Sequence, residues 1–88
     1  MIKDLPITEL LAGLAEECCE LGQAALKYRR AVDGTNPTPM TIPEANENLV
    51  EEIADVLLYL SLIPHDEIRV SEIMYEKRER WKARLADA

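Results

Sequence analysis

The chain has 88 residues and a formal net charge of −7, and hydrophobic residues make up 48% of it. This length fits one small domain spanning residues 1–88, and the apolar content excludes a disordered tail. The acidic balance argues against long nucleic acid as a partner. The longest apolar run, Val56 to Ile63, is too short to cross a membrane.

The residue types favour a helical, cytoplasmic protein. With one Trp, three Tyr and no Phe, the core must be aliphatic, which suits helices better than a β-sandwich. The only cysteines, Cys18 and Cys19, are adjacent, and their diverging Cβ vectors disfavour a disulfide between them. Reduced thiols, and an N-terminus without the apolar segment of a signal peptide, predict a cytoplasmic location.

The first predicted helix runs from Thr8 to about Val32. Its apolar residues recur every three or four positions and form one stripe, comprising Leu10, Leu11, Leu14, Cys18, Leu21, Ala25, Tyr28 and Val32. Glu17 lies just beside this stripe, and Glu20 lies one step further round the helix.

Small residues lie on the first predicted helix near Glu17 and Glu20, and others end this helix. Gly13 and Ala24 share one side of it and leave room for an approaching group. Gly34 is suited to a left-handed helix cap, and Pro37 and Pro39 prevent the helix from continuing. A loop is therefore predicted before the next helix.

The second predicted helix begins at Thr41-Ile42-Pro43-Glu44, which matches a capping box with a proline in the first turn. It should run to about Leu62, because Pro64 follows. One of its faces is apolar, comprising Leu49, Ile53, Val56, Leu57 and Leu60, and a second stripe comprises Asn48, Glu52, Asp55 and Tyr59. Leu58 and Leu62 lie beyond that stripe, so a helix apolar nearly all round is predicted to be buried, with Glu52 and Asp55 enclosed.

The third predicted helix runs from about Asp66 to Ala86. Its apolar face comprises Val70, Ile73, Met74, Trp81 and Leu85. Lys77 falls in the middle of this face, with Arg84 and Arg80 toward one edge. A lysine in that position can extend its stem to water or place its ammonium group beside an internal anion.

Two acidic pairs carry the chemistry of this sequence. Glu17 and Glu20 on one helix, and Glu52 and Asp55 on the next, are each three residues apart and so share a helical face. Like charges at that spacing repel, and a cation would offset the repulsion. Four convergent oxygen ligands suit Mg²⁺ or Mn²⁺, although Glu17 and Glu20 alone would also fit a solvated face.

A di-iron carboxylate site is a competing interpretation. Such bundles use Glu-x-x-His motifs, but the only histidine, His65, falls in a connector, which favours Mg²⁺ or Mn²⁺ over iron. A Mg²⁺ site usually shares its ion with substrate phosphates, which also need cationic partners. The candidates are Lys77, Arg80, Arg84, Lys27 and Arg30, each of which could instead form a surface salt bridge.

Glu16-Glu17-x-x-Glu20, followed by Glu52-x-x-Asp55 within residues 48–58, resembles the MazG-like all-α nucleoside triphosphate pyrophosphohydrolases. The resemblance covers nearly the whole chain, although the interval between the two motifs is long for a compact member of that family. It implies that Glu17, Glu20, Glu52 and Asp55 hold Mg²⁺. It also implies hydrolysis of a nucleoside triphosphate to a monophosphate and pyrophosphate, by a homodimer or homotetramer whose helices complete a four-helix bundle.

The predicted fold is all-α, a three-helix subunit that completes a four-helix bundle by oligomerisation. Glu17, Glu20, Glu52 and Asp55 are the predicted metal ligands and catalytic residues. The predicted substrate-binding residues are Lys77, Arg80, Asn48 and Lys27. Either Glu16 or Glu51 could act as a base or outside the metal shell, and Tyr59 either stacks on a base or belongs to the core.

Two other functions remain open on the sequence. The chain could be a non-catalytic helical interaction or regulatory module whose acidic stripes bind a basic partner. It could also be a ferritin-like metal carrier, which would bind iron tightly without nucleotide. Release of pyrophosphate from a nucleoside triphosphate distinguishes the enzyme from both.

Overall fold

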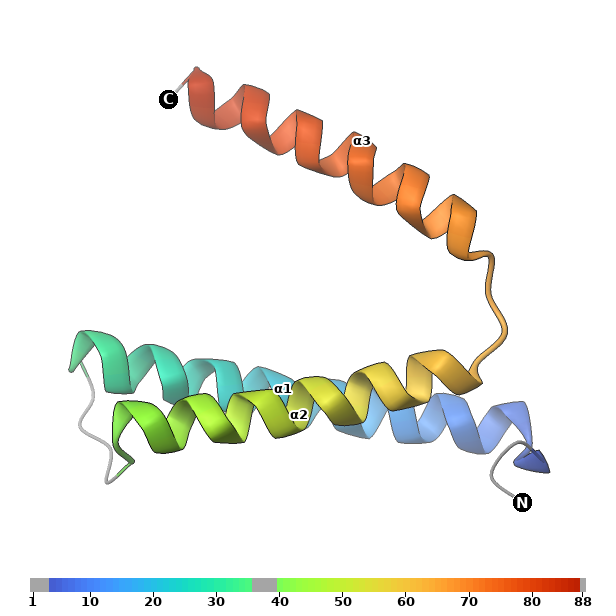
Figure 1. The fold of residues 1–88 in the computed structure, drawn as a ribbon, viewed down its shortest axis with the longest axis horizontal. Helices are drawn as coiled ribbons and strands as arrows, with labels where there is room; N and C mark the ends of the chain where they lie inside the picture. Colours follow the sequence, from blue (N-terminus) through green and yellow to red (C-terminus); the bar gives the residue numbers. More distant parts are fainter. Residues whose placement is uncertain (1–3, 36–39, 88) are drawn as a thin grey trace.

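The computed structural model describes residues 4–35 and 40–87, which form three helices and no strand (Figure 1). The helices are α1 (Ile7–Asp33), α2 (Ile42–Leu62) and α3 (Glu67–Ala86), within one residue of the predicted bounds. Residues 36–39 of the predicted loop, including both of its prolines, lie outside the described part. No helix in the described ranges combines the length and apolar character that spanning a bilayer requires.

The helix ends follow the predicted local signals. Gly34 has a φ of 66° and donates its N–H to the Arg30 carbonyl at 2.9 Å, which confirms the left-handed cap. Thr41 Oγ1 accepts the N–H of Glu44 at 3.2 Å and donates to Glu44 Oε1 at 2.9 Å. Asp66 likewise accepts the N–H of Arg69 at 2.9 Å and begins α3. Local hydrogen bonding thus sets where these helices begin and end.

Replacing Thr41 with Ala should lower the free energy of unfolding by about 1 kcal/mol, because the N–H of Glu44 loses its acceptor. Urea unfolding followed by circular dichroism measures the change. Thr8→Ala is a suitable control, because Thr8 lies within the first turn of α1 and makes no cap hydrogen bond there. Equal losses in the two variants would contradict the capping role.

α1 and α2 form an antiparallel hairpin, and α3 leaves it at an angle (Figure 1). The two hairpin helices pack along each other, whereas α3 makes only marginal contact with either of them. The radius of gyration is 16.6 Å, against about 12 Å for a compact domain of this length. Among the described residues only Leu10, Ala24 and Ala45 are buried, so the single chain has a very small core.

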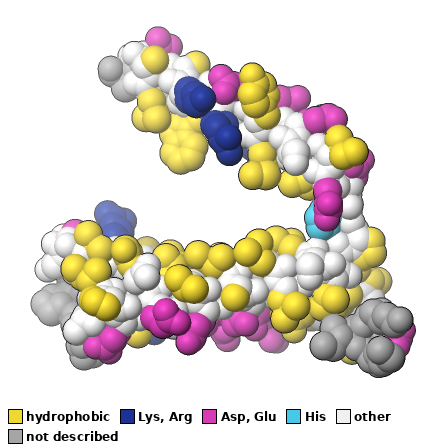
Figure 2. All heavy atoms as spheres, in the orientation of Figure 1, with side chains coloured by type: hydrophobic (Ala, Val, Ile, Leu, Met, Phe, Trp, Pro, Cys, Tyr) yellow, Lys and Arg dark blue, Asp and Glu magenta, His cyan; other side chains and the backbone are white. Residues whose placement is uncertain are grey.

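The predicted burial of α2 is not met within a single chain. Val50, Ile53 and Leu57 on α2 are 48%, 40% and 59% exposed, because α3 does not cover the hairpin. Hydrophobic side chains gather on the side of the hairpin turned toward α3 and on the side of α3 turned toward the hairpin (Figure 2). Apolar surface this extensive on a small chain is typical of an interaction face.

Candidate metal centre

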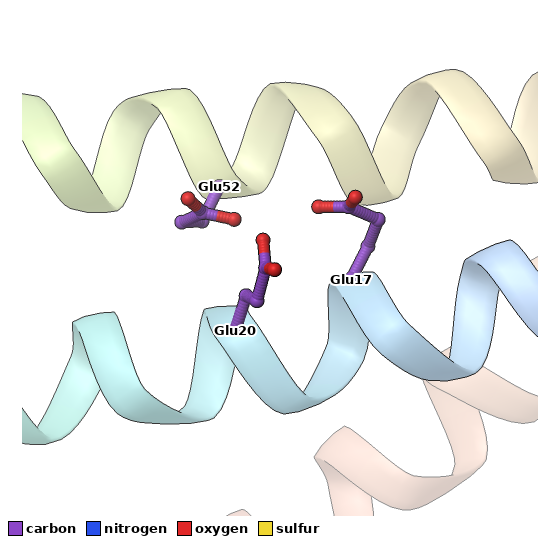
Figure 3. A group of neighbouring side chains, drawn as sticks. All are labelled: Glu17, Glu20 and Glu52. Carbon is purple, nitrogen blue, oxygen red and sulfur yellow. The ribbon is translucent and has the colours of Figure 1, made fainter.

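Three of the four predicted acidic ligands converge in the middle of the hairpin. Glu17 and Glu20 come from α1 and Glu52 from α2, and one carboxylate oxygen from each lies within 4.8 Å of the others. Figure 3 shows their side chains between the two ribbons, with the carboxylates close together. The structure therefore brings together residues that lie more than thirty positions apart in the sequence.

The spacing of residues along the helices explains this convergence. The positions on each helix that face the other helix recur at alternating intervals of three and four residues, as in a coiled coil. On α1 these positions include Gly13, Glu17, Glu20 and Ala24, and on α2 they include Ala45, Asn48, Glu52, Asp55 and Tyr59. Ala24 and Ala45 are buried, and their small side chains allow the helices to approach on that side of the acidic residues.

Asp55, the fourth predicted ligand, lies next to Glu17 but outside the group of three. It is exposed, yet it lies close enough to Glu17 for its charge to raise the pKa of that carboxyl group. Glu20 raises the pKa of Glu52 in the same way, and their carboxylate oxygens lie within 4.8 Å of each other. The acids therefore form two cross-helix pairs, each with one carboxyl group from α1 and one from α2.

The surroundings of these acids disfavour their charged forms. Loss of hydration raises the pKa of Glu17 from 4.5 to about 6, and the charges of Glu20, Asp55 and Glu52 act in the same direction. The pKa of Glu52 is also raised, first by loss of hydration and then by Glu20 and Asp55. The group thus favours proton uptake or a bound cation near neutral pH.

Two oxygens of the group are shielded from solvent and lack a partner. These are Glu17 Oε2 and Glu52 Oε2, for which the described part of the chain supplies no hydrogen bond. The rest of both side chains is half-buried, and Glu20 and Asp55 are exposed. The predicted enclosure is therefore incomplete in one chain, because the acids lie at the edge of the seam between α1 and α2.

Two predicted substrate-binding residues also lie on the hairpin. Asn48 is one turn before Glu52 on α2, and Lys27 is two turns after Glu20 on α1; both are half-buried. Helical spacing places them beyond the same end of the acidic group, where Ala24 and Ala45 leave the seam narrow.

The other predicted substrate-binding residues, Lys77 and Arg80, are not brought to the acidic group. Both are exposed on α3, where they line an open hollow of about 390 Å³ with Trp81 and Arg84. Lys77 was predicted on the buried face of a packed helix; in one chain that face is open, because α3 leaves the hairpin. No ion pair engages Lys77, Arg80 or Arg84 within the described ranges.

Trp81 is a candidate that the sequence analysis placed only on the apolar face of the third helix. It is 64% exposed and lies among the three basic side chains of the α3 hollow. Lys77 precedes Trp81 by four residues, and Arg84 follows it by three. Residues at these spacings are neighbours on a helix, so the sequence already indicated that the indole lies among cations. An exposed indole beside cations can pack against a planar or anionic ligand.

Histidine takes no part in the acidic group. Nδ1 of His65 lies 2.7 Å from the carbonyl oxygen of Ile63 in the connector between α2 and α3. The described cluster therefore consists of carboxylates alone, the donors that hard divalent cations prefer.

None of the protein-family models, curated proteins or solved structures compared with this chain matches it.

Proposed function

We propose that the chain is a Mg²⁺-dependent nucleoside triphosphate pyrophosphohydrolase, with Mn²⁺ as a possible substitute. It would convert a nucleoside triphosphate to the monophosphate and pyrophosphate. The observation that carries the proposal is the convergence of Glu17, Glu20 and Glu52 from two helices. The resemblance of the two acidic motifs to the MazG-like family supplies the reaction class.

The residues fit a hard divalent cation. Glu17 Oε2 and Glu52 Oε2 are shielded and without a partner, and every donor in the group is a carboxylate oxygen. Glu17, Glu20 and Glu52 would hold the ion, with Asp55 beside Glu17 as the fourth carboxylate. A bound divalent ion offsets phosphate charge and promotes ionisation of water at the reacting phosphorus.

The remaining side chains would bind and orient the nucleotide. Asn48 can orient the carboxylate of Glu52 or contact the nucleotide, and Lys27 can bind a phosphate oxygen further along the hairpin. Lys77 and Arg80 carry positive charge without an ion-pair partner in the described chain, and phosphates are suitable partners for them. Glu16 and Glu51 are both exposed next to a ligand, so either can accept the proton of the attacking water.

We further propose that the chain works as a homodimer or homotetramer. The hairpin exposes a row of large apolar residues, and α3 exposes Met74, Trp81 and Leu85. Pairing of two hairpins would cover this surface and complete a four-helix bundle. The extended shape and the very small core of one chain support this arrangement.

One observation favours a different class of function. α3 combines exposed apolar residues with a basic hollow and barely contacts the hairpin, as expected of a non-catalytic module that binds another protein. Incubation with each common and modified nucleoside triphosphate and Mg²⁺ separates the two. The enzyme releases pyrophosphate from at least one of them and stops when EDTA is added, whereas no release from any nucleotide supports the binding module.

The raised pKa of Glu17 predicts that the metal-free protein is more stable at pH 5 than at pH 7. The folded state holds the proton up to about pH 6, whereas the unfolded state loses it near pH 4.5, so stability falls as pH rises through this window. Asp33 has the opposite effect, because hydrogen bonds from Thr35 lower the pKa of its carboxyl group. The stability that this gives is lost only below pH 3.8, outside the range from pH 5 to pH 7.

Mg²⁺ should reverse this dependence, because the ion competes with the proton for the same carboxylates. At a hundredfold excess over its dissociation constant, a ligand adds about 2.7 kcal/mol to the free energy of unfolding. Thermal unfolding at both pH values, with Mg²⁺ and with EDTA, measures the effect. Stabilisation by Mg²⁺ that is equal at pH 5 and pH 7 would contradict binding at Glu17.

A further inference from the structure

A tyrosine from α2 occupies the space above a glycine of α1. A Cβ atom built on Gly13 would lie 2.5 Å from Tyr59 Oη and closer still to Cε1 and Cζ of the same ring, well inside the 3.0 Å that real Cβ atoms respect. Both residues are half-buried. The sequence predicted that Gly13 leaves room for an approaching group, and that group is the ring of Tyr59.

This contact directly adjoins the acidic group. Gly13 is one turn before Glu17 on α1, and Tyr59 is one turn after Asp55 on α2. Because each pair of residues on one helix is four positions apart and the helices are antiparallel, the layer of Gly13 and Tyr59 and the layer of Glu17 and Asp55 are consecutive along the seam. Any change in helix separation at the first layer is transmitted to the second, because both helices are continuous there.

We infer that Gly13 and Tyr59 are a positioning pair that sets the separation of α1 and α2 at the acidic group. The ring bridges the helices at one end of the acids, and a side chain at position 13 would force the ring or one of the helices to move. The effect on metal binding rests on the proposed function, whereas the contact itself does not. This assigns Tyr59 to the seam rather than to stacking on a base.

The contact can be tested without metal by NMR. One Hα proton of Gly13 points in the direction of the added Cβ, toward the outer edge of the Tyr59 ring, so its chemical shift should depart from that of a solvated helical glycine. Tyr59→Leu should remove the departure, and nuclear Overhauser effects should link the ring to Gly13 in the parent. Gly13 chemical shifts typical of a solvated helix, together with no nuclear Overhauser effect between Gly13 and the Tyr59 ring, would overturn the inference.

The positioning role can be tested by Mn²⁺ binding, followed by electron paramagnetic resonance. Gly13→Ala should weaken binding about tenfold, the size of effect typical of residues that support metal ligands. The double variant Gly13→Ala, Tyr59→Leu should recover to within about threefold of the parent, because the smaller side chain accommodates the new methyl group.

Gly22→Ala is the matched control, because Gly22 is on the same helix and an added Cβ meets nothing within 4 Å. It should bind Mn²⁺ like the parent and melt a few degrees higher, as expected for a glycine replaced within a helix.

The outcomes separate the inference from the proposed function. Parent-like Mn²⁺ binding by Gly13→Ala would overturn the positioning role, and so would weak binding that the double variant does not restore. A parent protein that shows the NMR contact but binds no Mn²⁺ and releases no pyrophosphate would overturn the proposed function instead. The role of Gly13 and Tyr59 in metal binding would be overturned with it.

Discussion

Glu52→Gln should lower kcat/KM for pyrophosphate release by about 10²–10³-fold, the range for loss of a group that stabilises transition-state charge. The substitution keeps the size of the side chain and removes one negative charge from the centre of the acidic group. Glu52 supplies one of the two shielded oxygens without a partner, so the substitution removes a charged ligand from the least hydrated part of the group.

The same variant should be more stable than the parent in the absence of metal. Glu20 and Asp55 both raise the pKa of Glu52 by repulsion, and a neutral amide relieves that repulsion. Lower activity combined with higher metal-free stability is the signature of a residue kept for ligand binding. A merely structural glutamate would lose stability on replacement.

Glu47→Gln is the matched control, because Glu47 is an exposed acid on α2 outside the converging group. Its activity and its response to Mg²⁺ should equal those of the parent. Initial rates of pyrophosphate release and thermal unfolding with and without Mg²⁺ provide both readouts. Equal rates for Glu52→Gln and the parent would remove Glu52 from the active site.

Leu57→Glu should convert the protein to a monomer at micromolar concentration. Leu57 is 59% exposed in the single chain and lies on the apolar surface that we assign to self-association. Burying an unpaired carboxylate in such an interface should raise the dissociation constant at least about a hundredfold. Activity should fall in parallel if the oligomer completes the bundle around the acidic group.

Sedimentation velocity across a concentration series measures the effect. Gln23→Glu, which adds the same charge at an exposed polar position of α1, should leave the assembly unchanged. A parent protein that stays monomeric throughout the series would contradict self-association. An oligomeric Leu57→Glu would place the interface on another surface.

The local features of the fold could be predicted from the sequence because they depend on residues close together in the chain. Gly34 ends α1 through its own left-handed backbone, and Thr41 begins α2 through a hydrogen bond three residues away. The shared face of Glu17 and Glu20, and that of Glu52 and Asp55, follows from helical periodicity alone. Each of these features is decided within one or two helical turns.

Only the tertiary structure decided which residues of the two helices meet. Periodicity identified the inward faces, but the register that pairs Glu17 with Asp55 and Gly13 with Tyr59 depends on the fit of both helices along the whole seam. The placement of α3 also required the structure. A pattern shows that the face containing Trp81 is apolar, but it does not show what covers it.

For the same reason the predicted inward position of Lys77 and the enclosure of Glu52 and Asp55 were not met within one chain. Hydrophobic periodicity states that a surface favours burial, whereas burial itself depends on another element reaching that surface. Here the sequence by itself determined the helices, their ends and the acidic faces. The convergence of those faces, and the exposure left by α3, were decided by contacts between distant residues.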